Sequence, residues 1–331
     1  MALSRRDFLK GASAVGGALA AATAGFWRLP KAMASTTGQD VVWLQGAACT
    51  GCSVSLLNSI YYATIDKLLI NTLDLKYHSN LMAAAGDTAV AAAEAARTAG
   101  GYVLVVEGAI PTGDSGKFCY VWPGKTAAQA LQDYAANAAL IVAVGTCAAF
   151  GGVSGATVDG AANPTGAKGI SALLPGKTVV NIPGCPAHPD WVVGTVAYVL
   201  ANGKAPPLDA NNRPTDFFGS LVHDNCPNRP MFNANYAPWM SMALGQACLA
   251  CHGNNDTDVP NPRRLGMTGC LFAVGCKGPQ THADCPIRQW NGSAASTPGV
   301  SWCVGAKSPC HGCTEPDFPD GQSPFFVLNN G

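Results

Sequence analysis

Twelve side chains, eleven of the fourteen cysteines and one histidine, fall into three groups of four, and this partition constrains the fold more than any other feature. Four thiolate-type ligands are what a cubane iron–sulfur cluster requires. A fold in which each group forms one site has to bring together cysteines that lie far apart in the chain. The first group is Cys49, Cys52, Cys147 and Cys185; the second is His223, Cys226, Cys270 and Cys276; the third is Cys285, Cys303, Cys310 and Cys313.

Short apolar runs that end at glycine alternate with helical segments in the first two thirds of the chain. Buried parallel strands have this pattern, so the sequence predicts an α/β fold, a flavodoxin-like doubly wound parallel sheet. We expect strands at Val41–Gln45, Leu68–Leu75, Tyr102–Val106, Ala139–Val144 and Lys177–Ile182, and helices at Ser53–Tyr62, Ala83–Thr98, Lys125–Ala136 and Trp191–Leu200.

The first cysteine group follows the ends of these strands. Cys49 and Cys52 follow the first strand, while Cys147 and Cys185 each follow a later one. Ligands of such sheets bind at the carboxyl ends of the strands, so these thiols are predicted to meet in one crevice. Glu107 ends a further strand and should face the same crevice.

The character of the chain changes near Pro206-Pro207, after which proline, asparagine, glycine and cysteine dominate. So loop-rich a segment could hardly hold a core alone, and clusters would supply the missing cross-links. We expect a flavodoxin-like domain at 35–205 with one cluster and a C-terminal iron–sulfur domain at 206–331 with two.

Residues 1–34 have the features of a twin-arginine signal peptide. Arg5-Arg6 precede a weakly apolar Ala- and Gly-rich stretch, and Ala32-Met33-Ala34 supplies a small-residue cleavage site. This route exports folded proteins, commonly with a cofactor already inserted, so it predicts a periplasmic location and favours cluster ligands over disulfides. No later segment is long and apolar enough to predict a transmembrane helix. The formal net charge is zero and no basic tract suggests nucleic acid.

Each group also allows an alternative interpretation of the site that it forms. A Cys-x-x-Cys pair such as Cys49/Cys52 occurs in redox disulfides and zinc sites as well as in iron–sulfur sites. His223 alone would be a solvent-facing loop residue, and with three cysteines it also fits zinc. Cys285, Cys310 and Cys313 alone would hold a three-iron cluster, and Cys303 as a fourth ligand allows a full cubane.

Three cysteines stay outside the groups. Cys119 is most simply a packed thiol. Cys248 and Cys251, followed by His252, match the c-type haem attachment pattern. We discount haem because it is attached to an unfolded chain outside the cytoplasm, whereas a twin-arginine substrate arrives folded. A local disulfide, free thiols or a metal-binding loop remain as readings.

With these motifs the chain resembles the small subunit of nickel–iron hydrogenases from Val41 to Pro319. The resemblance implies that the first group binds a proximal [4Fe-4S] cluster, the third a medial cluster and the second a distal [4Fe-4S] cluster with one histidine ligand. It rests on Cys49-Thr50-Gly51-Cys52, Glu107-Gly108, Gly145-Thr146-Cys147, Pro183-Gly184-Cys185-Pro186, His223 with Cys226, Gly275-Cys276-Lys277-Gly278-Pro279, Cys285, and Pro309-Cys310-His311-Gly312-Cys313-Thr314-Glu315-Pro316.

Two positions refine the subtype that the resemblance implies. Many members of the family have proline at the position of Cys303 and a medial [3Fe-4S] cluster, so Cys303 suggests a medial [4Fe-4S] cluster, as in the nickel–iron–selenium branch. Oxygen-tolerant members carry two extra proximal cysteines, and Gly51 and Gly152 look like the corresponding positions here. An ordinary proximal cluster is therefore expected.

The resemblance implies an electron-transfer role. Hydrogen would be split in a separate large subunit with a nickel–iron or nickel–iron–selenium site, and three clusters would relay the electrons to an external partner such as a multihaem cytochrome c. Glu107 would accept backbone hydrogen bonds beside the proximal cluster, with a proton relay as the other reading. The main alternative function is a stand-alone ferredoxin-like carrier; a structural zinc protein and the cluster-bearing component of a quinone-reducing complex are further rivals.

Overall fold

The computed structural model describes residues 38–235, 269–291 and 299–323. The predicted signal peptide at 1–34 and the segment with Cys248, Cys251 and His252 lie outside these residues.

A five-stranded parallel sheet forms the centre of the first two thirds of the chain. Its strand order is β2-β1-β3-β6-β7, so the third, fourth and fifth strands in sequence follow the first on one side and the second lies on the other. This is the flavodoxin-like order, and the predicted fold class is confirmed. The strands are β1 (Gln39–Gln45), β2 (Leu73–His78), β3 (Val103–Glu107), β6 (Leu140–Val144) and β7 (Val179–Ile182); β4 (Tyr120–Trp122) and β5 (Lys125–Thr126) form a separate hairpin.

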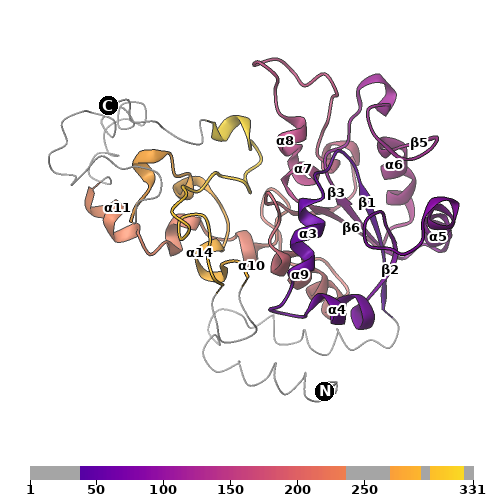
Figure 1. Ribbon diagram of the computed structural model, residues 1–331, viewed down its shortest axis with the longest axis horizontal. Helices are drawn as coiled ribbons and strands as arrows, with labels where there is room; N and C mark the ends of the chain where they lie inside the picture. The colour runs from indigo at the N-terminus through magenta and orange to yellow at the C-terminus, as the bar shows by residue number, and fades with distance from the viewer. Residues whose placement is uncertain (1–37, 236–268, 292–298, 324–331) are drawn as a thin grey trace.

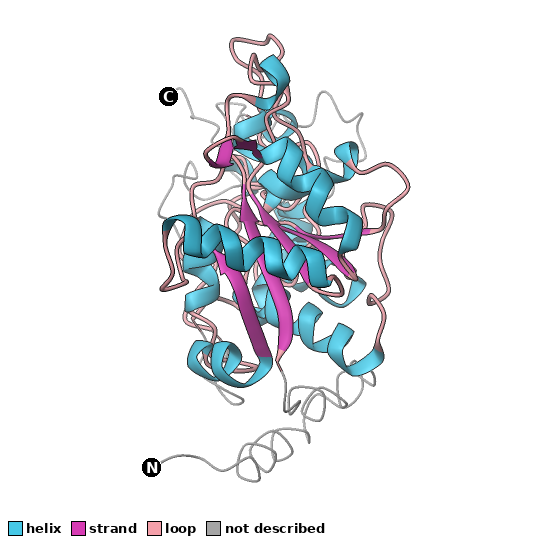
Figure 2. Cartoon of the chain, turned by 90° about the vertical axis from the view of Figure 1, so that its right-hand side faces the viewer, coloured by secondary structure: helices cyan, strands magenta, loops and turns pink. Residues whose placement is uncertain are grey.

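Alternate side chains of each central strand enter different cores. Val41 and Trp43 of β1 pack with α3 (Gly51–Leu57) and α9 (Pro189–Asn202), whereas Val42 and Leu44 pack with α5 (Gly86–Ala99) and α6 (Ala127–Asn137). Figures 1 and 2 show the sheet between these two helical layers. Because both faces are covered, the central strands are mainly apolar on both sides, whereas the edge strand β2 carries the exposed Asp74.

The remaining elements of this region are short. They are α4 (Ile65–Lys67), η2 (Leu68–Thr72), η3 (Gly113–Gly116), α7 (Thr146–Phe150), α8 (Gly152–Gly155) and η4 (Ile170–Leu173). At the start of the longer helix α6, Thr126 and Gln129 form a capping box.

One predicted strand is partly wrong. Leu68–Thr72 form a π-helical turn after α4, and the strand begins only at Leu73. A short apolar run does not distinguish a strand from a buried helical turn. The predicted helix from Ser53 also ends early, at Leu57, and the β4–β5 hairpin was not predicted.

The region after residue 205 consists mainly of loops and single helical turns, at the left of Figure 1. Its apolar residues, among them Val222 and Trp302, join the same buried cluster as α9. No helix in the described ranges combines the length and the apolar character needed to cross a membrane. The elements are α10 (Thr215–Phe218), η5 (Val222–Asn225), α11 (Arg229–Asn235), η6 (Phe272–Val274), η7 (Gly278–Gln280), α14 (Cys285–Arg288) and η8 (Asp320–Gln322).

Candidate functional site

The four cysteines of the first group meet beyond the carboxyl ends of β1, β6 and β7. Cys52 interacts electrostatically with Cys147 and Cys185, and Cys185 with Cys147 and Cys49. Cys52 is buried, while Cys49 and Cys185 are exposed. The parallel sheet thus brings together cysteines that lie more than a hundred positions apart in the chain, from Cys49 to Cys185.

Two glycines leave room for these thiols. A Cβ on Gly145 would lie 2.5 Å from the Cys52 sulfur, and one on Gly152 would lie 2.9 Å from the Cys147 sulfur. Both glycines have positive φ, 86° and 52°, which disfavours any other residue. The backbone therefore forms a cradle around the sulfurs that side chains would fill.

Glu107, at the end of β3, is a buried acceptor beside this group. It accepts hydrogen bonds from the backbone N–H groups of Cys52, at 3.0 Å, and Ser53, at 3.3 Å. The Ser53 hydroxyl, the Trp43 indole and the Gln45 amide also donate to it. With five donors Glu107 anchors the start of α3, and the proton-relay role stays a prediction.

His78 extends this network away from the cysteines. Its Nδ1 accepts from the Asn80 N–H, so Nε2 carries the hydrogen and donates to the Ser53 hydroxyl, 3.0 Å away. The hydroxyl then donates to Glu107. His78 has no exposed surface, and this burial lowers its pKa to about 4.

A substitution at His78 should change the acid sensitivity of the fold. Its pKa is about 4 in the folded protein against an ordinary value of 6.5, so the unfolded chain binds the proton more tightly and stability falls as pH drops from 6.5 towards 4. Glutamine cannot take up this proton. We expect His78→Gln to flatten the pH dependence by up to about 1.4 kcal/mol per pH unit in that window. The free energy of unfolding of the wild type and of His78→Gln, measured with denaturant near neutral pH and at about pH 5, tests this expectation. An equal change of that free energy with pH in both proteins would contradict it.

The second group lines one pocket in the C-terminal region. His223, Cys226, Cys270 and Cys276 all border it, together with apolar side chains such as Phe232. The His223 ring packs edge-on against Phe232, with 4.4 Å between ring centroids. Desolvation raises the pKa of Cys276 to about 11 and also raises that of Cys226.

All four cysteines of the third group also converge. Cys285 interacts electrostatically with Cys313, Cys310 and Cys303, and the Cys303 thiol in turn acts on Cys310 and Cys313. Desolvation is the main reason why the pKa values of Cys285, Cys310 and Cys313 are raised, whereas Cys303 is exposed at the surface. The structure therefore brings Cys303 to the three thiols with which the sequence grouped it.

Contacts between ligand residues join the three groups. The backbone N–H and the thiol of Cys185 both act electrostatically on the Cys313 thiol, which places the first group beside the third. The Cys310 N–H donates to the Cys276 sulfur at 3.3 Å, which links the third group to the second. The third group thus lies between the other two.

The donor set suits iron–sulfur clusters. All twelve cysteines in the described ranges are free, and the three groups place eleven thiols and one imidazole around three centres. Buried thiols resist ionisation alone, but a bound metal deprotonates a coordinating thiol. Within the described residues, no group of three or more His, Cys, Asp or Glu side chains has the geometry of a single-ion site.

Sequence reasoning missed several residues around these groups. Thr146, His78 and Arg213 gave no recognisable signal of these roles, because their contacts come from distant segments. Only the glycine before Thr146 and Cys147 marked a close backbone approach. Cys119 lies outside the groups, packed beside the β4–β5 hairpin.

Known families match both parts of the chain. Residues 49–199 match the family model of the NADH ubiquinone oxidoreductase 20 kDa subunit. Residues 218–326 match the model for the C-terminal region of the NiFe/NiFeSe hydrogenase small subunit.

Individual relatives cover nearly the whole chain. The periplasmic [NiFe] hydrogenase small subunit 1 of Nitratidesulfovibrio vulgaris is 40% identical over 328 residues, or 98% of this chain and 93% of that protein. The periplasmic [NiFeSe] hydrogenase small subunit of Desulfomicrobium baculatum is 36% identical, with 99% of both chains covered. A crystal structure of the reduced, active Ni-Fe-Se hydrogenase from Desulfomicrobium baculatum matches with a TM-score of 0.74 at 36% identity, over 88% of this chain and 100% of that one. On this similarity the chain belongs to the small-subunit family of nickel–iron hydrogenases, with relatives in the nickel–iron–selenium branch.

Proposed function

We propose that this chain is the electron-transfer subunit of a periplasmic nickel–iron-type hydrogenase, with three iron–sulfur clusters that relay electrons between the large subunit and an external redox partner. The observation that carries the proposal is the row of three ligand groups, in which Cys185 acts electrostatically on Cys313 and the Cys310 N–H donates to the Cys276 sulfur. A row of this kind suits a relay better than three separate structural sites.

The ligand roles follow from the order of the groups. Cys49, Cys52, Cys147 and Cys185 would hold the proximal [4Fe-4S] cluster, Cys285, Cys303, Cys310 and Cys313 the medial one, and His223, Cys226, Cys270 and Cys276 the distal one. Each cluster, when bound, supplies a site that takes up and releases one electron. Because His223 is a neutral ligand where a thiolate would add negative charge, it should raise the potential of the distal cluster.

The large hydrogenase subunit would cover the face around the first group. Cys49 and Cys185 are exposed there, and so are the apolar side chains of Val54 and Leu57 on α3. Exposed apolar surface beside a redox group is suited to a subunit interface. The nickel–iron or nickel–iron–selenium site would lie in that subunit, close to the proximal cluster.

The external partner would dock near the second group, at the other end of the row. A c-type cytochrome is the acceptor we propose, consistent with a periplasmic location like that named for several relatives. Export through the twin-arginine pathway is part of the same proposal. A chain that purifies with clusters but without a large subunit would favour the alternative of a stand-alone carrier.

An anaerobic count of iron and acid-labile sulfide in the purified heterodimer tests the proposal. After correction for iron in the large subunit, we expect about twelve irons and twelve sulfides. About eleven irons with twelve sulfides would mean a three-iron medial cluster. Zinc in place of iron would contradict the whole assignment.

Cys303→Ala should convert the medial cluster to a three-iron form. The thiol lies beside Cys310, Cys313 and Cys285, so its loss removes one of four ligands. We expect the loss of about one iron, a new three-iron EPR signal, and a rise of the medial potential on the order of 100 mV or more. Cys119→Ala removes a partly buried thiol outside the groups and should change none of these. An unchanged iron count in Cys303→Ala would exclude Cys303 as a ligand.

A further inference from the structure

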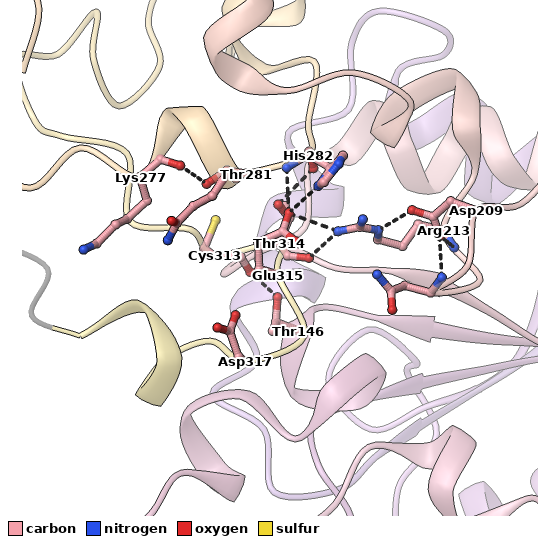
Figure 3. Close-up of polar contacts among 12 residues, drawn as sticks. Thr146, Asp209, Arg213, Lys277, Thr281, His282, Cys313, Thr314, Glu315 and Asp317 are labelled. Atoms are coloured by element: carbon pink, nitrogen blue, oxygen red, sulfur yellow. Dashed lines mark hydrogen bonds and ion pairs between the residues drawn. The ribbon is translucent and has the colours of Figure 1, made fainter. Parts of the chain in front are cut away.

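Thr146 is a buried residue that connects three cysteine-bearing segments. It directly precedes Cys147, and only 1% of its surface is exposed. Its hydroxyl accepts a hydrogen bond from the Gly184 N–H at 2.8 Å, next to Cys185. The same hydroxyl donates to the backbone carbonyl of Cys313, as Figure 3 shows. One oxygen therefore joins the loops of two first-group cysteines to a cysteine of the third group.

The surrounding backbone fixes this arrangement. The Thr146 N–H donates to the Gly184 carbonyl at 3.0 Å, so that Thr146 and Gly184 bind each other in both directions. With Gly184 held in this way, the backbone N–H of the next residue, Cys185, lies close enough to act electrostatically on the Cys313 thiol. The hydroxyl and this N–H act on the same residue of the third group, one through its carbonyl and the other through its sulfur.

We propose that Thr146 is a positioning residue for electron transfer between the first and third ligand groups, because its hydroxyl holds the Cys185 and Cys313 segments in contact. This inference rests on the proposed function. In the step concerned, one electron would pass from the cluster held by the first group to the cluster held by the third, and no covalent bond would form or break. Electron transfer is faster across a short, hydrogen-bonded contact than across a gap, so the loss of this contact should slow the transfer between the two groups.

The second junction of the row provides a useful comparison. There, Cys310 donates to the Cys276 sulfur, and the Lys277 N–H donates to the Cys310 carbonyl at 2.8 Å. These two donors are backbone N–H groups, which only a substitution by proline would remove. A side-chain hydroxyl takes part at this junction too, because that of Thr281 donates to the Lys277 carbonyl and accepts from the Cys310 thiol at 3.5 Å. The Thr146 hydroxyl differs in that both of its partners are backbone groups, one from each cysteine-bearing segment.

Thr146→Val tests the proposal, because valine has nearly the same shape without the hydroxyl. The Gly184 N–H and the Cys313 carbonyl would lose their shared partner. In the purified heterodimer we expect unchanged iron and sulfide but a several-fold slower transfer from the proximal to the medial cluster. Rapid-freeze EPR after exposure to hydrogen follows the two clusters separately, and a redox titration of each cluster shows whether a change in driving force accounts for the rate.

Two further variants complete the design. Thr146→Ser keeps the hydroxyl and should transfer electrons at the wild-type rate. Thr195→Val is the matched control, since Thr195 is also 1% exposed and donates its hydroxyl to a backbone carbonyl, that of Trp191, within α9. It should leave both the iron content and the transfer rate unchanged.

Every outcome bears on the proposal. An unchanged transfer rate in Thr146→Val with full clusters would overturn the role of Thr146 and leave the relay intact. Iron loss in Thr146→Val but not in Thr195→Val would also overturn it, because the hydroxyl would then be needed to hold a cluster. A wild-type heterodimer with no clusters on this chain would instead refute the proposed function.

Discussion

Arg213→Met is expected to lower the free energy of unfolding by about 3–5 kcal/mol, the usual cost of breaking a buried ion pair from one side. The Arg213 side chain is 2% exposed, and its guanidinium lies 2.7 Å from Asp209 and 3.1 Å from Glu315. It also donates to the Thr314 carbonyl at 3.1 Å, as seen in Figure 3. Methionine would fill much of the space but leave Glu315 buried without its cation.

The loss of the Arg213 ion pairs should also destabilise the segment that carries Cys313. Glu315 also accepts from the His282 N–H at 2.6 Å, so Arg213 helps to hold two segments of the C-terminal loops together, next to Cys313. Anaerobic guanidinium unfolding followed by tryptophan fluorescence measures the loss. Lys117→Met is the control, because it breaks an ion pair with Asp114 whose side chains are 58% and 60% exposed. It should cost at most about 1 kcal/mol, and an equal cost for both variants would contradict the argument.

Gly145→Ala is expected to abolish cluster binding at the first group. The added methyl carbon would lie 2.5 Å from the Cys52 sulfur, a distance at which that thiol has to move out of the group. The residue would also be forced into a positive φ of 86°. We expect the variant to lose about four of twelve irons and the EPR signal of the proximal cluster.

Gly176→Ala separates the steric effect from backbone strain. Gly176 has a positive φ of 80°, but an added Cβ would meet nothing within 4 Å. This control should cost about 1–2 kcal/mol of stability through strain alone and keep its iron. If Gly145→Ala retained full iron and the proximal signal, the cradle would not be a requirement for the cluster.

The sequence predicted the sheet because its central strands carry apolar residues on both faces, and because β1, β3, β6 and β7 are each followed within two residues by a glycine. Those strand ends also predicted that Cys49, Cys147 and Cys185 would meet, because parallel strands deliver their carboxyl ends to one edge. It was less reliable at Leu68–Thr72, where a short apolar run fits a helical turn as well as a strand.

By itself, the sequence determined the fold class, the family and the grouping of the twelve candidate ligands, since these depend on local patterns and motifs. Only the tertiary structure decided how the groups touch, with Cys313 against Cys185 and Cys310 against Cys276. It also decided the roles of Thr146 and Arg213. Thr146 binds Cys313 and Arg213 binds Glu315, each more than a hundred positions away in the chain, and a hydrogen bond between such segments leaves no periodic pattern to read.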